Sequence, residues 1–233
     1  MRERANDQTR PIRLELGYTD ATPGSVLISM GATRVLCTAS VDNDVPRWMR
    51  DSGKGWVTAE YGMLPGSSPE RVRRDHISGG RAKEISRLIG RSLRAAVNLR
   101  AMADLMVRVD CDVIQADGGT RTAAITGGWI ALHQALSHAV ELGWINEVPI
   151  VDEIAAISVG IIDGEPRLDL DYELDVNADV DMNVVMSGRG LFIEVQGTAE
   201  KAPFTRDELD LLLDLATKGN SELHALQREA VAP

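Results

Sequence analysis

Alternating apolar and polar residues are the main pattern in the first part of the chain. Apolar and charged side chains alternate over 12–16, which is typical of a half-buried strand. Two β-rich runs follow, over 25–30 and 33–41, and only Gly31 and Ala32 separate them. This arrangement predicts a β-hairpin, because two such runs joined by a short glycine-containing turn are its usual signature.

The periodicity changes after residue 80. From Arg81 to about Ala103, apolar residues recur at steps of three and four, which predicts a helix with one apolar face. The opposite face carries a basic stripe made of Lys83, Arg87, Arg91 and Arg94. The other expected elements are strands over 56–61, 106–114, 153–162, 167–170, 183–187 and 191–196, and helices over 123–142 and 205–227.

The order of these elements is strands, helix, strand, helix, strands, helix. No linker rich in Pro, Gly or Ser divides them, so we expect a single α+β domain over residues 1–233. The predicted hairpins argue against a purely parallel, doubly wound sheet. A domain of this length buries roughly 70–75% of its unfolded surface and needs no disulfide or metal for its core.

The composition of the chain indicates the cellular compartment of the protein. The first thirteen residues are too polar for a secretory signal, and the longest clean apolar run, 154–162, is too short to span a membrane. The two cysteines, Cys37 and Cys111, both lie in strand-like segments. Two such thiols fit a reducing cytoplasm better than a disulfide framework. We therefore expect a cytoplasmic protein without a membrane partner.

Charge is divided unevenly along the chain, although the net charge is −10. Residues 1–100 carry 17 basic and 11 acidic side chains, whereas residues 101–233 carry 8 basic and 24 acidic ones. Such asymmetry suggests a face for phosphate or nucleic acid beside an acidic face that could bind metal. A solvated basic helix next to a solubilising acidic half explains the same counts equally well.

The most specific local signal is Asp117-Gly118-Gly119-Thr120-Arg121-Thr122, which follows a predicted strand and opens a helix. Helix N-termini bind anions through unpaired N–H groups, glycine allows close approach to the backbone, and arginine grips phosphate with two hydrogen bonds. Ser78-Gly79-Gly80-Arg81 leads into the preceding helix in the same way. Spacing alone leaves open whether the two ends converge, and a capped helix whose arginine pairs with an acid is the alternative.

An acidic run between residues 169 and 181 is the third signal. Carboxylates are ligands that Mg²⁺ prefers, usually one or two of them together with water and substrate phosphate. An acidic run alone is more often a solvated surface. Its combination with two anion-binding helix ends and a basic face favours metal-assisted phosphoryl transfer on a nucleic acid.

Several motifs together resemble those of the ribonuclease PH family of phosphate-dependent exoribonucleases. The resemblance runs nearly from end to end and is strongest over Asp110–Ala123. It implies a β-α-β-α fold related to domain 2 of ribosomal protein S5, and a homohexameric ring built as a trimer of dimers. The implied activity is phosphorolysis, in which inorganic phosphate attacks the 3′-terminal phosphodiester of RNA and releases a nucleoside diphosphate. The implied substrates are tRNA precursors with extra 3′ nucleotides. The other matching segments are 10–12, 24–27, 34–40, 58–65, 181–186 and 193–200.

The resemblance also implies roles for individual residues. Phosphate is expected at Arg81, Gly119, Thr120 and Arg121, and Asp175 and Asp181 are the expected Mg²⁺ ligands. The catalytic residues would be Asp181, Asp175 and Arg121. The chain departs from the usual pattern after Arg81, where Ala82 takes the place of a threonine. RNA contacts are expected from a long loop over 62–80 and from the basic stripe of the following helix. These residues are Arg71, Arg73, Arg74, Arg87 and Arg91.

Two other functions remain open on the sequence. One is an RNA-binding ring subunit without catalytic activity, and the other is an exoribonuclease in which a Mg²⁺-activated water replaces phosphate. Retention of both arginines and both aspartates argues against the first. The second would release nucleoside monophosphates.

Overall fold

The computed structural model describes residues 4–73, 79–102, 104–201 and 203–232. Its first half forms a five-stranded sheet in the order β1-β2-β3-β5-β4. All neighbours in this sheet are antiparallel except β4 and β5, which run parallel. Parallel strands need a crossover connection, and α1, Gly80–Ala95, supplies it while packing against β4. The strands are β1 (Ile12–Leu16), β2 (Gly24–Met30), β3 (Thr33–Asp42), β4 (Trp56–Met63) and β5 (Met106–Gln115).

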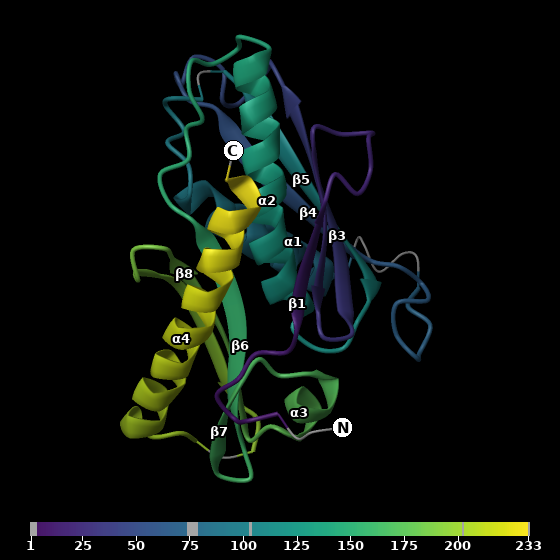
Figure 1. Cartoon of the computed structure of the whole chain (residues 1–233), viewed down its shortest axis with the longest axis vertical. Coiled ribbons are helices and arrows are strands. Elements are labelled where there is room, and N and C mark those ends of the chain that lie inside the picture. Colours follow the sequence, from purple (N-terminus) through teal and green to yellow (C-terminus); the bar gives the residue numbers. More distant parts are fainter. Residues whose placement is uncertain (1–3, 74–78, 103, 202, 233) are drawn as a thin grey trace.

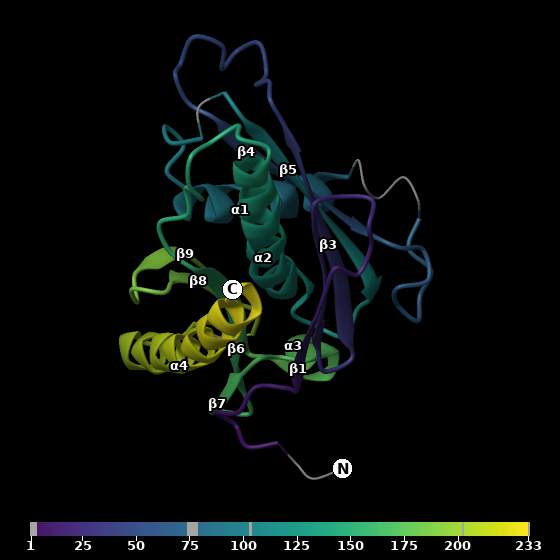
Figure 2. The same cartoon turned by 45° about the horizontal axis from the view of Figure 1, so that its top comes forward.

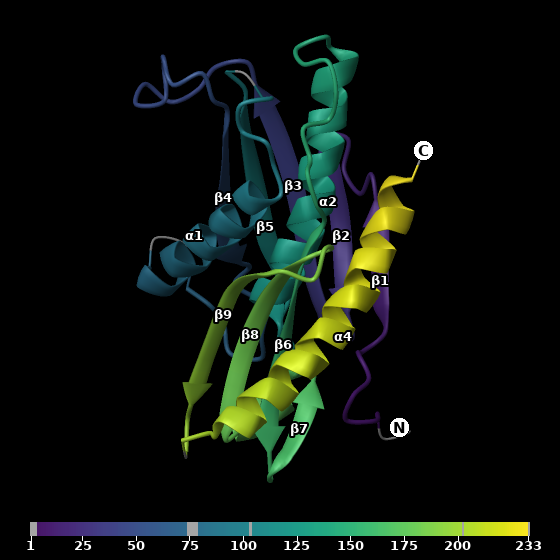
Figure 3. The same cartoon turned by 90° about the vertical axis from the view of Figure 1, so that its left-hand side faces the viewer.

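The second half forms a four-stranded antiparallel sheet in the order β7-β6-β8-β9. The C-terminal helix α4, Arg206–Val231, packs along β6, β7 and β8 (Figure 3). Thr205 and Glu208 form a capping box at the start of this helix, which fixes its first turn. The strands are β6 (Ile154–Ile162), β7 (Glu165–Leu168), β8 (Val180–Ser187) and β9 (Phe192–Ala199).

Helix α2, Thr120–Glu141, joins the two halves through the middle of the molecule (Figure 1). It packs against β2 and β3 of the first sheet and against β6 of the second. A Cβ at Gly127 would lie 2.8 Å from Ile28 and 3.0 Å from Cys37, so glycine permits this close approach. One continuous hydrophobic core therefore runs from the first sheet through α2 to the second sheet and α4.

The α+β class is confirmed and every predicted strand is present, although strand ends differ by up to three residues; β8, for example, begins at Val180 instead of residue 183. The helices differ from the sequence analysis in three main respects. Helix α1 ends at Ala95 instead of near residue 103, because the chain turns there and Val97 forms a bridge with Ile150. Helix α2 begins three residues earlier than expected, at Thr120. The acidic run contains a short helix, α3, Tyr172–Asn177, which is N-capped by the carboxylate of Asp171.

The state of the two cysteines and the apolar character of the helices can be compared with the sequence analysis. Cys37 and Cys111 are opposite one another on β3 and β5, both are buried beneath α2, and neither forms a disulfide. Cys37, together with burial, raises the pKa of the Cys111 thiol. Within the described ranges, no helix is both long enough and apolar enough to cross a membrane.

Candidate active site

The turn between β5 and α2 is the most tightly fixed part of the site. Gly118 and Gly119 have φ angles of +72° and +64°, in the left-handed region that favours glycine. A Cβ at Gly118 would lie within 2.5–2.7 Å of backbone atoms of residues 170–172. The Thr33 hydroxyl donates to the Gly118 carbonyl over 2.6 Å and accepts from the Asp117 N–H over 2.9 Å. The turn is thus held both by the first sheet and by the segment that leads into α3. Figures 1 and 2 show α3 beside this end of the first sheet.

Side chains from three other elements fix the first turn of α2. The hydroxyls of Tyr61, on β4, and Thr120 lie 2.8 Å apart in a hydrogen bond. Burial raises the pKa of Tyr61, so the phenol stays protonated near neutral pH. Arg121 donates to Gln196 Oε1, on β9, over 3.3 Å and lies 3.8 Å from Glu84, on α1. The guanidinium is therefore held in one place while 21% of its side chain stays accessible.

The N-terminus of α1 is constructed more simply. Gly79 occupies the cap position without a side-chain cap, and the first turn contains no acidic residue. Arg81 is exposed there, and the first N–H groups of the helix have no side-chain partner from the cap. Such an end suits an incoming anion.

The two arginines face a common region although they come from different helices. The charges of Arg81 and Arg121 both act on Tyr61, and both lower the pKa of Asp175. Glu84, near the start of α1, also lies 3.8 Å from Arg121 on α2, so the two helix N-termini converge beside the acidic run, which spacing could not establish. The parallel crossover through α1 produces this convergence, because it places the start of α1 next to the start of α2.

Asp175, on α3, and Asp181, at the start of β8, lie close enough for their charges to interact. Loss of hydration raises the pKa of both carboxyl groups. The negative charge of Asp175 raises the pKa of Asp181 further, and Glu200 raises both. Neighbouring carboxylates that disfavour each other's ionisation are suited to a cation or to proton transfer.

The two carboxylates of Asp175 and Asp181 fit a divalent cation that takes its remaining ligands from water and substrate. Among the residues that the structure describes, no group of three or more His, Cys, Asp or Glu side chains is placed to hold a metal ion. Asp175 and Asp181 supply two carboxylates, which matches the usual mode of Mg²⁺ binding, with remaining positions left to water and substrate phosphate. A self-contained protein cage for the metal is absent from the described ranges.

The expected RNA contacts fall into different environments. Arg71, Arg73 and Arg87 are exposed, on the loop after β4 and on α1, whereas Arg74 lies outside the described residues. Arg91 forms a two-pronged ion pair with Glu194, on β9, at 2.8 Å. Glu194 in turn accepts from Gln196, so Arg91 belongs to a chain of polar contacts that ends at Arg121. The RNA-binding roles of these arginines stay predictions.

Three residues of the site were not assigned by the sequence analysis. Tyr61, Gln196 and Glu200 contact or electrostatically influence the arginines and aspartates. All three lie within segments that carried the family resemblance, over 58–65 and 193–200. Their position in those segments was the available signal, but the folded arrangement is needed to assign contacts to them.

Comparison with known proteins agrees with this geometry. The model of the 3′ exoribonuclease family, domain 1, matches residues 8–137, and that of domain 2 of the same family matches residues 140–219. Ribonuclease PH of Corynebacterium efficiens is 55% identical over 231 residues, which cover 98% of this chain and 94% of that protein. The chain belongs to the ribonuclease PH family.

Family membership refines the description of the domain. The two family models meet near the end of α2, whereas the sequence analysis expected one domain over the whole chain. The ribonuclease PH fold here places one sheet in each matched segment, with α2 packing against both. The two segments therefore share a single hydrophobic core.

Solved structures show the same fold at low sequence identity. An archaeal exosome core aligns with TM-score 0.77 at 18% identity, covering 97% of this chain and 89% of that one. An Archaeoglobus fulgidus exosome with RNA bound to the active site aligns with TM-score 0.79 at 20% identity, covering 97% and 90%. Rice (Oryza sativa) Rrp46 aligns with TM-score 0.75 at 18% identity, covering 97% and 96%.

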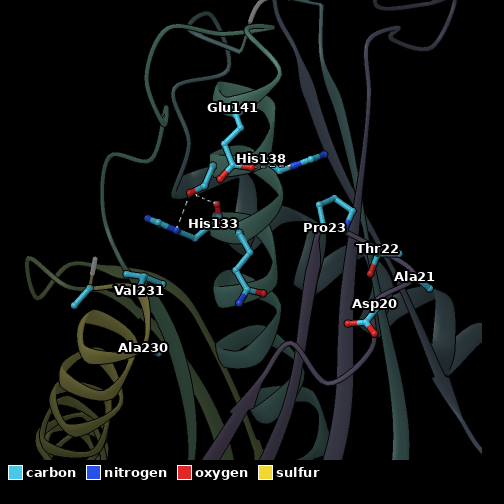
Figure 4. A pocket seen from close by; sticks show the side chains of 12 residues that line it. Asp20, Ala21, Thr22, Pro23, His133, His138, Glu141, Ala230 and Val231 are labelled. Atoms are coloured by element: carbon cyan, nitrogen blue, oxygen red, sulfur yellow. Dashed lines mark hydrogen bonds and ion pairs between the residues drawn. The ribbon is translucent and has the colours of Figure 1, made fainter.

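A separate cavity of about 600 Å³ lies between α2, the loop before β2 and the end of α4 (Figure 4). Its lining includes His133, His138 and Asp20. Burial lowers the pKa of His133, and His138 is 3.2 Å from Glu141. Neither arginine and neither aspartate of the candidate site lines this cavity. It is therefore distinct from the candidate active site.

Proposed function

We propose that this member of the ribonuclease PH family is a phosphorolytic 3′→5′ exoribonuclease. The observation that carries the proposal is the approach of two helix N-termini, where Glu84 of α1 lies 3.8 Å from Arg121 of α2, with the charges of Arg81 and Arg121 both acting on Asp175. A site for a free anion and a pair of carboxylates thus lie next to each other. Transfer of a nucleotidyl group to inorganic phosphate requires this combination.

Electrostatic repulsion is the first obstacle to the reaction, because both reactants are anions. At about 4 Å and an effective dielectric near 20, each pair of like charges costs roughly 4 kcal/mol. Arg81, Arg121 and the backbone N–H groups at Gly119 and Thr120 offset this repulsion and orient the incoming phosphate. The chemical step is in-line attack by a phosphate oxygen on the terminal diester phosphorus.

The aspartates act on the other side of the scissile bond. As the bond from phosphorus to the 3′-oxygen breaks, that oxygen receives a proton, and the terminal nucleotide leaves as a nucleoside diphosphate. Asp181, whose pKa is raised, supplies or relays the proton. Mg²⁺ held by Asp175 and Asp181 would neutralise charge on the scissile phosphate.

The resemblance to the family supports a proposal for the substrate, the oligomeric state and the compartment. We infer that the substrates are tRNA precursors with extra 3′ nucleotides, that the enzyme works as a homohexamer, and that it acts in the cytoplasm. Free, buried Cys37 and Cys111 support a reducing compartment. The exposed Arg71 and Arg87 support electrostatic attraction of RNA, which salt would weaken steeply.

One assay separates the candidate functions. A 3′-extended tRNA precursor is incubated with the protein and Mg²⁺, with and without inorganic phosphate, and the released nucleotides are identified by chromatography. Phosphorolysis gives nucleoside diphosphates only when phosphate is present. Release of monophosphates without phosphate would show hydrolysis, and RNA binding without any release would show a non-catalytic subunit.

The Asp181→Asn variant tests the role of the carboxylate pair. Loss of general acid catalysis typically costs about 10²–10⁴-fold in rate, so we expect turnover to fall by this order. RNA binding, measured by fluorescence anisotropy, should persist, because Asp181 is not among the basic residues that attract RNA. Turnover close to that of the wild type at every Mg²⁺ concentration would remove Asp181 from the mechanism.

A further inference from the structure

Arg10, which lies two residues before β1, has an unusual environment for an arginine. Its side chain is 6% exposed, and its guanidinium makes hydrogen bonds through all three nitrogens. Nε and one terminal nitrogen grip the carboxylate of Asp169 at 2.9 and 2.7 Å, and the backbone N–H of Arg10 adds a third bond at 2.8 Å. A buried charge is costly unless it is paired in this way, so the pair must keep this geometry.

The remaining terminal nitrogen of Arg10 reaches the turn between β5 and α2, residues 116–119, which we call the phosphate turn because phosphate is expected there. It donates to the carbonyl of Asp117 over 2.6 Å. That carbonyl immediately precedes Gly118 and Gly119, and a Cβ at Gly119 would lie 3.0 Å from the Arg10 side chain. The orientation of the peptide that starts the turn is thus linked to Arg10.

Asp169 stands at the other end of this connection. It is fully buried, has a left-handed φ of 58°, and its N–H donates to the Ser158 carbonyl. Two residues later, Asp171 caps α3, which carries Asp175. The position of Asp169 therefore sets where the acidic segment begins.

We infer that Arg10 is a positioning residue that sets the phosphate turn in register with the aspartates. The ion pair joins the start of the first sheet to the end of β7 in the second sheet, directly behind the turn. Arg10 acts through the Asp117 carbonyl, and contact with a reactant is not part of the inference. The role rests on the proposed phosphorolysis, because it concerns where the phosphate is held.

The Arg10→Lys variant distinguishes the effect of the guanidinium geometry from the effect of the positive charge. Arg10→Lys keeps a cation beside Asp169 but cannot make the two-pronged grip and reach the Asp117 carbonyl together. We expect the KM for phosphate to rise by about tenfold or more, because a reoriented Asp117–Gly118 peptide would weaken the binding of the anion at the turn by about one charge-assisted hydrogen bond. The KM for RNA and the kcat at saturating phosphate should change less than about threefold, since the RNA-facing residues are untouched.

A double variant keeps the test valid if single changes impair folding. Arg10→Met together with Asp169→Asn removes both buried charges, while asparagine tolerates the left-handed φ at this position and can still accept the backbone N–H of residue 10. With thermal stability restored, the KM for phosphate should remain high, because the Asp117 carbonyl still lacks its donor. Return of the KM to the wild-type value would show that Arg10 serves folding alone.

Arg4→Met is the matched control. Arg4 also ion-pairs with Asp169, at 3.5 Å, and donates to the carbonyls of Leu168 and Asp169, but no hydrogen bond joins it to the phosphate turn. Its KM for phosphate should stay within about twofold of the wild type. An equal rise in both variants, or no rise in Arg10→Lys, would overturn the inference. Absence of phosphate-dependent release by the wild type would instead refute the proposed function.

Discussion

The two helix N-termini at the candidate site carry similar sequences but are constructed differently. The start of α2 is fixed by Thr33, Tyr61 and Arg10 and by two glycines with positive φ. Neither helix has a side-chain cap, but at the start of α1 the cap residue Gly79 is extended and a Cβ at Gly80 would meet nothing within 4 Å. Both ends nevertheless present an arginine to the same region.

This difference suggests that the N-termini of α1 and α2 contribute differently to phosphate binding. A fixed donor stabilises developing charge without reorganisation, whereas an exposed side chain loses conformational freedom when it binds. We therefore interpret α2 as the rigid wall of the phosphate site and α1 as its adaptable wall. The predictions below test that distinction, from the largest expected effect to the smallest.

Removal of the two arginines should have unequal effects. Arg121→Ala removes a guanidinium that Gln196 and Glu84 hold in place, and we expect a loss of about 10²–10³-fold in kcat/KM for phosphate. Arg81→Ala removes an exposed side chain, and about tenfold is expected. Steady-state phosphorolysis measures both, with circular dichroism to confirm folding. Equal losses would mean that the two walls are equally organised.

A methyl group added to each turn compares the two backbones directly. Gly118→Ala forces a left-handed residue against three backbone atoms of the 170–172 segment, so we expect a destabilisation of about 2–4 kcal/mol. Gly80→Ala adds a methyl in open space at a helical position and should stay within about 0.5 kcal/mol of the wild type. Urea unfolding measures both. A stable Gly118→Ala variant would contradict the tight packing of this turn.

Tyr61→Phe tests one contact of the rigid wall without changing its charge. The variant loses the hydrogen bond to Thr120, and we expect a destabilisation of about 0.5–1.5 kcal/mol. The KM for phosphate should rise only slightly, because Thr33 and Arg10 still hold the turn. A large rise in this KM, with little change in Tm, would show that the phenol itself contacts the anion.

Glu200→Gln should produce the smallest effect, a change in pH dependence. The negative charge of Glu200 raises the pKa of Asp175 and Asp181, so its removal lowers both. If the ionised carboxylates are required to hold Mg²⁺, activity should then persist to lower pH. The acidic limb of kcat/KM against pH, measured at a subsaturating Mg²⁺ concentration, should move to lower pH. A limb that moves upwards would contradict the assigned electrostatics.

The sequence predicted the strands and the longer helices well, because each has a clear hydrophobic period. It missed α3, since a six-residue helix without buried residues leaves no periodic pattern. The end of α1 was misplaced because a long-range bridge at Val97 overrides the local pattern. Local propensity is therefore least informative where tertiary contacts decide the boundary.

The sequence predicted which residues form the candidate site but not how they are arranged in space. The glycine–arginine turns and the two aspartates were identified from chemistry and family resemblance. Their convergence depends on the parallel pairing of β4 with β5, which brings the two helix starts together. The ion pair of Arg91 with Glu194 depends on the approach of β9 to α1, and residue spacing gives no sign of it.

The facing thiols of Cys37 and Cys111 are a built-in probe of local opening in the core. They lie at the contact between α2 and the first sheet, and because both are buried they should resist alkylation in the folded protein. The raised pKa of Cys111 adds to this resistance. Labelling would then occur only when α2 lifts from the strands beneath it. The rate of iodoacetamide incorporation would thus measure how often the helix that begins at the candidate active site detaches, with no engineered probe.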